Sequence, residues 1–244
     1  MSADKEKSKV HKLSLKGSSK LVAEFFEYSI NSILYGDYPT DQNRVYPAED
    51  FSPVKKYGLN MLVSSDDQVR AYIKKIMSQL NKWMIGGKIS KLVVVITSKE
   101  TGEHVERWQF DVQIFKQAAA AGRKKSSTAD KENSATAAAD RENAAAAEEP
   151  TPEKTETQIQ QEIQAIFRQI TASVTFLPVL DGNCTFNVLV YADADSDVPV
   201  EWGDSDAKEI TNGEKVQLRS FSTNNHRVDT LVYWKYGMAF AVGF

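Results

Sequence analysis

The sequence lacks most of the features by which secreted proteins and membrane proteins are recognised. Its single cysteine, Cys184, rules out an internal disulfide and favours a reducing compartment. No apolar run approaches the ~20 residues that a membrane helix needs, and the opening MSADKEKSKVHK has no apolar signal-peptide core. We therefore expect a protein of the nucleus and cytoplasm that does not enter a membrane.

The sequence also lacks a strong excess of charge of one sign, and it lacks catalytic motifs. The 30 basic and 33 acidic residues give a net charge of −3, which offers no electrostatic case for nucleic acid. There is no glycine-rich phosphate loop, no G-x-S-x-G and no H-E-x-x-H. An acidic stretch at 193–204 is similar to a calcium loop, but Val198 stands at its glycine position and Asp204 at its glutamate position. We predict no catalytic residue, no metal and no cofactor.

What the sequence does contain is a set of amphipathic helices. Apolar residues recur at helical spacing from Leu21 to Leu34, where Ser18 or Ser19 can act as the cap. A second helix is predicted from about Asp66 to Trp83, ended by the glycines at 86–87. A third helix begins near Gln158, and its core-facing stripe consists of Ile159, Ile163, Ile166, Ile170, Val174 and Leu177.

Strand patterns lie between and after these helices. Residues 91–96 are apolar on both faces and predict an interior strand, whereas 107–114 alternate and predict one covered face. Further strands are expected at 184–191 and 214–221. The alternating apolar end, from Val232 to Phe244, should pair at a sheet edge or meet a partner. Helices beside strands without βαβ alternation predict an α+β fold, with one sheet covered on one face.

Two long segments break the pattern. Residues 36–53 carry three prolines and predict an exposed loop. Residues 116–156 are rich in alanine and charge, and they predict a disordered insertion because they cannot bury enough apolar surface. This insertion contains KEN at 131–133, which is either a degradation signal or a product of its composition. We expect a flexible terminus at 1–12 and a single domain at 13–244.

Several stretches taken together resemble the HORMA family, above all its spindle-checkpoint branch. They follow the family order from about Leu13 to Lys235: GSSKLVAEFFEYSINSILY, KYGLNMLV, KLVVVITSKETGEHVERWQFD, EIQAIFRQITASVTFLPVL, FNVLVYADAD, VPVEW and VQLRSFSTNNHRV. The loop at 36–53, the insertion and the apolar end after Lys235 depart from the family pattern.

The resemblance implies an adaptor without catalysis, which switches between open and closed conformers. Family members capture an extended peptide at a sheet edge and wrap their C-terminal region around it as a safety belt. The implied partners are the mitotic activator of the anaphase-promoting complex, the checkpoint scaffold mitotic-arrest-deficient one and the mitotic checkpoint complex. A second copy in an open–closed homodimer and an AAA+ remodelling ATPase are also implied. Such an adaptor would act at kinetochores when the checkpoint is active, and it would delay anaphase.

The resemblance also places site residues in this sequence. The partner-peptide edge strand would consist of Phe186, Val188, Val190 and Tyr191. The safety belt would span about 193–235, with Trp202, Val216, Leu218, Phe221, His226, Val232 and Trp234. Trp83 is either a packing anchor or associated with closure, and Thr230 is a candidate phosphorylation site.

One stretch, FRQITASVTFLP at 167–178, raises a separate question. Arg168 and Phe176 follow an i, i+4, i+8 row through Ala172, beside the core stripe. Either Arg168 is solvated and Phe176 lies under the next loop, or both belong to an interface. The resemblance favours a self-association face made of Arg168, Gln169 and Phe176.

Two alternatives stay open at this point. One is another HORMA adaptor, such as an accessory subunit of a translesion polymerase or a meiotic axis protein, although RQITASVTFLP fits the checkpoint branch better. The other is an enzyme with an unrecognised site, which the missing catalytic motifs oppose.

Overall fold

The computed structural model describes residues 14–35, 45–115, 154–180 and 183–235. Three helices lie on one face of the main sheet: α1 (Leu15–Tyr35), α2 (Asp67–Ile85) and α3 (Glu156–Ala172). Short 3-10 turns follow at η1 (Ala48–Asp50) and η2 (Ser173–Thr175), and a hairpin of β1 (Phe51–Lys56) and β2 (Leu59–Ser64) packs beside the helices. The predicted α+β fold is confirmed.

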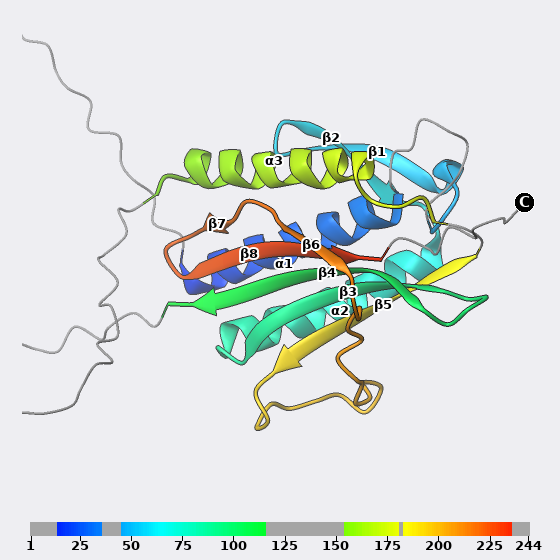
Figure 1. The fold of residues 1–244 in the computed structure, drawn as a ribbon. Coiled ribbons are helices and arrows are strands. Elements are labelled where there is room, and N and C mark those ends of the chain that lie inside the picture. The colour runs from blue at the N-terminus through cyan, green and yellow to red at the C-terminus, as the bar shows by residue number, and fades with distance from the viewer. Residues whose placement is uncertain (1–13, 36–44, 116–153, 181–182, 236–244) are drawn as a thin grey trace, which may run out of the picture.

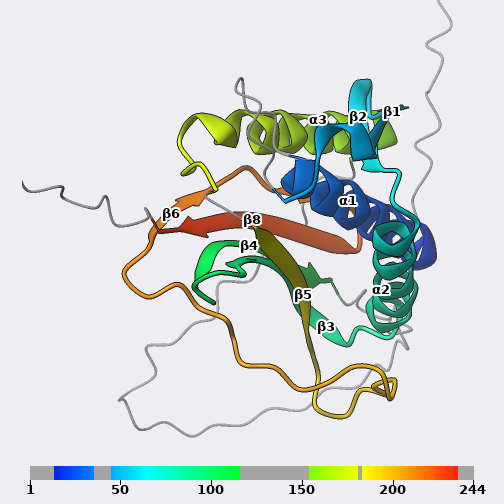
Figure 2. The same ribbon diagram turned by 90° about the vertical axis from the view of Figure 1, so that its right-hand side faces the viewer.

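The main sheet is antiparallel and brings the two ends of the domain together. Its strands are β3 (Ile89–Ser98), β4 (His104–Ile114), β5 (Cys184–Ala192), β6 (Glu214–Gln217), β7 (Phe221–Ser222) and β8 (His226–Trp234). The order is β5-β3-β4-β8-β6, and β7 also pairs with β8. Figures 1 and 2 show β8 between β4 and β6, while β5 forms the opposite edge. The last strand is therefore an interior strand of the sheet.

The helix boundaries follow from capping, with two corrections to the sequence prediction. Asp66 caps α2 by accepting hydrogen bonds from the backbone of Gln68 and Val69, and Gly87 has φ of 67°, so the predicted start and the glycine end of this helix are confirmed. The first helix, however, begins at Leu15, so Ser18 lies inside it and is fully buried rather than acting as a cap. The regular part of α3 ends at Ala172, before the end of the predicted stripe.

The folded chain resumes before α3 at residue 154, earlier than the predicted end of the insertion at 156. Thr155 forms a capping box with Gln158, and Lys154 pairs with Glu162 at 2.6 Å. The last three residues of the predicted insertion, 154–156, therefore belong to the fold. The rest of that insertion, including the KEN tripeptide, lies outside the described residues, as do the flexible terminus predicted at 1–12 and the apolar end at 236–244. The loop predicted at 36–53 ends in strand β1, which begins at Phe51.

The sheet is covered on both faces, which corrects the prediction for residues 107–114. Trp108 and Phe110 pack toward the helices as expected. On the opposite face Arg107 is only 5% exposed and Gln109 only 8%, although both are polar. Residues 92–96 are fully buried, as predicted for an interior strand, while Lys91 is half-buried, and β3 lies between β4 and β5. A further segment of the chain must therefore cover the outer face of the sheet.

The core between the helices and the sheet is aromatic, and it includes the C-terminal strands. Phe25 of α1 contacts Phe110 of β4 at 5.8 Å and Phe167 of α3 at 5.3 Å, measured between ring centroids. Phe221 of β7 lies 4.8 Å from the same Phe25 ring and is 1% exposed. Burying side chains of this size is a main source of fold stability. Strand β7 is thus part of the core rather than an attachment to it.

Candidate functional site

Strand β5 has a free edge. It pairs with β3 along one side, and on its other side no strand pairs with it within the described residues. A cavity of about 270 Å³ lies against this strand. Its walls come from β5 (Asn187, Val188, Leu189), from α2 (Tyr72, Lys75, Ile76) and from residues 201–208. A strand edge of this kind presents backbone N–H and C=O groups that can pair with an added strand.

The side chains of β5 divide between the two faces of the sheet. Phe186 is buried, with Tyr72 of α2 5.5 Å from its ring, while Val188 and Val190 are half-buried against the same core. Tyr191 has the opposite parity, and Lys91 lies 5.1 Å from its ring centroid. The predicted edge residues therefore lie on one strand, but Tyr191 does not share a face with the other three.

The chain after β5, residues 193–213, forms what we call the crossing loop. It is held first to the helix side of the molecule. The backbone N–H of Asp193 donates to the carbonyl of Lys88 at 2.8 Å, and Lys88 forms an ion pair with Asp195. The indole of Trp83 donates to the carbonyl of Asp197 at 3.0 Å. Trp83 thus joins α2 to the crossing loop.

Two further contacts extend this attachment along α2. Lys75 forms an ion pair with Glu201 at 2.9 Å. The rings of Trp83 and Trp202 meet nearly edge-to-face, with centroids 5.1 Å apart. The structure thereby places Trp202, a predicted belt residue, against the residue predicted to be associated with closure.

The crossing loop then passes to the other face of the sheet. Arg107 of β4, whose polar side chain is buried there, donates from Nε to the carbonyl of Ala207 at 3.4 Å. The same guanidinium donates to Gln109 at 2.6 Å and lies 5.5 Å from the ring centroid of Tyr233. Figure 2 shows the loop running from the end of β5, around the β5 edge and across to β6. The free edge and its cavity are thus enclosed by the loop.

Residues 214–235, which we call the return segment, contain β6, β7 and β8. Of the predicted belt residues, Leu218, Phe221, His226, Val232 and Trp234 are buried, whereas Val216 is 37% exposed. Thr230 lies in the middle of β8 opposite Phe110 and is fully buried. A kinase could reach its hydroxyl only after β8 had left the sheet.

A buried polar cluster ties the return segment to α1. The hydroxyl of Ser18 lies 2.5 Å from that of Thr223 and 2.6 Å from Nδ1 of His226. All three side chains are buried, and burial lowers the pKa of His226 from 6.5 to about 4. His226 is therefore neutral at pH 7. Sequence reasoning missed Ser18 because a serine near a helix start is usually a cap.

The predicted self-association residues lie along α3 and just after it, but they have different surroundings. Arg168 is exposed. Gln169 accepts a hydrogen bond from the backbone N–H of Arg219 at 2.7 Å, and Phe176 packs on Trp234 with ring centroids 5.3 Å apart. The return segment thus already covers part of the predicted face, and Phe176 is half-buried rather than a free anchor.

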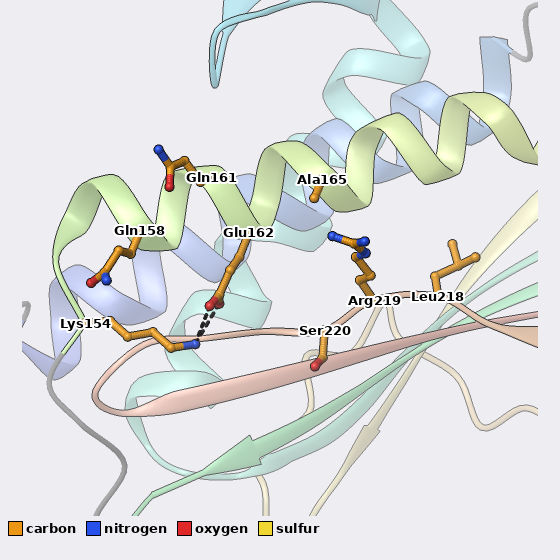
Figure 3. A pocket seen from close by; sticks show the side chains of 8 residues that line it. All are labelled: Lys154, Gln158, Gln161, Glu162, Ala165, Leu218, Arg219 and Ser220. Carbon is orange, nitrogen blue, oxygen red and sulfur yellow. Dashed lines mark hydrogen bonds and ion pairs between the residues drawn. The ribbon is translucent and has the colours of Figure 1, made fainter.

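Beside Gln169, a groove of about 620 Å³ runs between α3 and the return segment (Figure 3). The Lys154–Glu162 ion pair lies at one end, and Arg219 projects from the return segment toward α3 (Figure 3). Its remaining lining comes from Gln158, Gln161, Ala165, Leu218 and Ser220. Both walls are needed to form it, so the groove depends on where the return segment lies.

The described residues give no support for metal chemistry or a membrane span. Among them, no three His, Cys, Asp or Glu side chains converge as metal ligands would. None of their helices is long and apolar enough to cross a bilayer. What these residues do offer is an enclosed strand edge.

Comparisons with known proteins agree with this geometry. The HORMA domain family matches residues 18–226. The mitotic spindle checkpoint component mad2 of Schizosaccharomyces pombe is 52% identical over 222 residues, which cover 91% of this chain and 94% of that protein. The human mitotic spindle assembly checkpoint protein MAD2A is 41% identical over 223 residues, covering 91% and 93%.

Solved structures agree as well. A chain in the crystal structure of the mitotic checkpoint complex matches with a TM-score of 0.68 and 49% identity, covering 90% of this chain and 99% of that one. The structure of C. elegans HTP-2 bound to the HIM-3 closure motif has a TM-score of 0.63 at 15% identity, covering 97% and 99%. The second likeness concerns the fold alone.

Proposed function

The chain belongs to the HORMA domain family and is a spindle-checkpoint adaptor, and on that premise we propose that the β5 edge and the crossing loop together clasp a partner peptide. The observation that carries the proposal is the free edge of β5, enclosed by the crossing loop and facing a cavity of about 270 Å³. A peptide added there would gain main-chain hydrogen bonds from β5. Side-chain selection would come from the cavity walls.

We assign the present arrangement to the closed conformer, because the crossing loop already passes around the free edge. Entry of a peptide then requires the loop to release α2, including the Trp83–Asp197 hydrogen bond and the Lys75–Glu201 ion pair. Binding that waits for such a rearrangement is slow. An AAA+ remodelling ATPase would serve to reopen the clasp.

The partners we propose are the mitotic activator of the anaphase-promoting complex and the checkpoint scaffold mitotic-arrest-deficient one. The likeness to a chain of the mitotic checkpoint complex supports this choice. Capture of the activator would delay anaphase, and capture of the scaffold would bring the chain to kinetochores. Both roles need an edge and a clasp but no catalytic group, and we propose that the chain catalyses no reaction.

We further propose that a second, open copy docks along α3. Arg168 offers an exposed guanidinium, and the neighbouring groove adds Arg219 of the return segment. Gln169 and Phe176 support this face through their contacts with the return segment rather than as free anchors. Arg168→Glu should weaken self-association in sedimentation while leaving peptide capture intact.

The decisive test of the clasp uses a variant that fills the cavity beside β5. Leu189→Arg places a long charged side chain on the lining of the cavity, at a half-buried position. We expect it to abolish binding of a labelled peptide from the checkpoint scaffold, measured by fluorescence anisotropy, without lowering the melting temperature by more than a few degrees. Val216→Arg is the control, because Val216 lies on β6 at the far end of the strand order. If Leu189→Arg binds the scaffold peptide as tightly as the wild type does, the cavity beside β5 is not the peptide site.

A further inference from the structure

The outward face of α2 carries an excess of positive charge. Arg70, Lys74, Ser78 and Lys82 follow each other at steps of four residues, and Lys75 lies beside them. All five are exposed. We call these five residues the α2 basic face. It stands out because the chain as a whole has a net charge of −3.

Only part of this charge is compensated within the molecule. Arg70 lies 3.6 Å from Asp67, and Lys75 pairs with Glu201. Lys74 and Lys82 form no ion pair with any of the described residues. The two lysines lie two helical turns apart, about 12 Å along the axis. Their spacing suits a partner segment that carries more than one acidic side chain.

The crossing loop adds an apolar component next to this face. A cavity of about 460 Å³ lies between α2 (Ala71, Lys74, Lys75, Ser78, Gln79, Lys82) and the loop (Pro199, Glu201, Trp202). Beside it, Val200 is 101% exposed and Val198 is 54% exposed. Val200 buries no surface in the fold, and Val198, on the other side of Pro199, buries less than half of its own. Together with the cavity they offer an apolar contact beside the cations.

We propose that the α2 basic face and the tip of the crossing loop, residues 198–202, form a second docking surface for an acidic segment of a partner protein that also carries an apolar side chain. Glutamates or aspartates of that segment would pair with Lys74 and Lys82, and its apolar side chain would lie against Val198 and Val200. The surface is distinct from the β5 edge. It shares only Lys75, Glu201 and Trp202 with the lining of the cavity beside β5.

The surface is composite, and this has a regulatory consequence. Its cavity forms, and its valines lie beside the lysines of α2, only while the crossing loop is attached to α2 through Trp83 and Lys75. A partner that uses both parts binds the closed conformer preferentially. By linkage it also stabilises that conformer by the same factor. The second docking surface depends on the position of the crossing loop but not on the capture of a peptide at β5. The docking surface and the peptide clasp can therefore be disproved separately.

A short protein segment fits better than a nucleic acid. The crossing loop carries the exposed acids Asp195, Asp197 and Glu201, of which Glu201 pairs with Lys75 of α2 and Asp195 with Lys88 just after it. A long polyanion that extended past α2 would be repelled by them. An acidic peptide can confine its charges to the ~18 Å between Arg70 and Lys82.

The experiment uses the full chain and a fluorescein-labelled peptide of glutamates interspersed with leucines. The variant Lys74→Glu/Lys82→Glu reverses both uncompensated cations. The control Lys55→Glu/Lys99→Glu changes net charge equally, at two exposed lysines on β1 and the β3–β4 loop. We expect the first pair to weaken binding by about tenfold or more and the second by about twofold or less. Equal loss in both pairs, or no binding to the wild type, would overturn the proposal.

Two further arms test the composite nature of the surface and the class of partner. Val198→Ser/Val200→Ser should weaken the glutamate–leucine peptide several-fold and leave a leucine-free glutamate peptide unaffected. If both peptides bind this variant as they bind the wild type, the loop is not part of the surface and the proposal fails. Vesicles of phosphatidylserine and phosphatidylcholine provide the last comparison. Lysine-dependent binding to vesicles but not to the peptide would assign the face to membranes instead.

Discussion

The crossing loop and the return segment are consecutive in sequence, yet they are held in opposite ways. The crossing loop has no regular secondary structure, and its contacts with α2 include a hydrogen bond from Trp83 and an exposed ion pair with Lys75. The return segment forms three strands and places Phe221, Val228 and Val232 in the core. The crossing loop can therefore change its position with little loss of folding stability, whereas the return segment cannot. The region predicted as a safety belt at 193–235 therefore consists of two parts held in different ways: a loop attached at the surface of α2, which we propose controls access to the β5 edge, and a segment that packs into the core.

The strongest way to test this division is to remove core packing from the return segment. Phe221→Ala deletes a ring that contacts Phe25 at 4.8 Å, and we expect it to lower the free energy of unfolding by about 3–5 kcal/mol. Val216→Ala, at an exposed position of the same segment, should cost less than about 1 kcal/mol. Urea denaturation measures both changes. Similar values for the two variants would mean that the return segment is not clamped into the core.

Acidification tests the clamp at its polar attachment to α1. The pKa of His226 is about 4 in the folded chain and 6.5 when unperturbed, so folding favours the neutral ring. The resulting stability is complete above pH 6.5, and it is lost as the pH falls from 6.5 toward 4. From pH 8 to pH 5 we expect a loss of about 2 kcal/mol attributable to this residue. His226→Gln should flatten that part of the pH profile, and an unchanged profile would show that another group is responsible.

A smaller effect is expected at the attachment of the crossing loop. Trp83→Phe keeps an aromatic ring next to Trp202 but removes the hydrogen bond to Asp197, a loss of about 1 kcal/mol. We expect a labelled scaffold peptide to dissociate about fivefold faster, with thermal stability reduced by only a few degrees. If stability falls as much as in Phe221→Ala while dissociation is unchanged, Trp83 is a packing anchor only.

The smallest effect should come from the Lys75–Glu201 ion pair. Both side chains are more than half exposed, so the coupling energy in a double-mutant cycle should lie between about 0.2 and 1 kcal/mol. Stopped-flow measurements of peptide dissociation would give this energy. It should shrink further at high salt, because an exposed pair is screened. A coupling that resists salt would indicate that the loop buries this pair when a peptide is bound.

Sequence periodicity predicted the parts of the fold in which one face is buried against another. The isoleucine stripe of α3 and the apolar run of β3 were correct, because burial leaves a direct pattern in the sequence. Arg107 and Gln109 misled the same reasoning. Their alternation with apolar residues indicates a solvent-facing side, but both are buried, and Arg107 contacts Ala207 of the crossing loop from 100 residues away along the chain.

The site residues show the same limit. The peptide-binding edge and the belt were predicted only through the family resemblance, since strand edges have no pattern of their own. Phe176 was expected either under the next loop or in an interface, but it meets Trp234, whose position depends on how β8 pairs. Contacts of this kind join distant segments, and no local spacing encodes them. Ser18 and Thr223, whose hydroxyls meet across the core, could not have been paired from sequence.

The interior position of β8 determines what kind of event opening must be. A strand with neighbours on both sides cannot peel from an edge, because it must break its pairing with β4 on one side and with β6 and β7 on the other. Its departure would also expose Val228, Val232 and Trp234 to water. A conformational change that moves β8, unlike release of the crossing loop alone, should therefore behave as sub-global unfolding, accelerated by denaturant, with amide hydrogens of β4 and β8 exchanging through the same transition. In this chain the conformational switch and a folding intermediate would be one species.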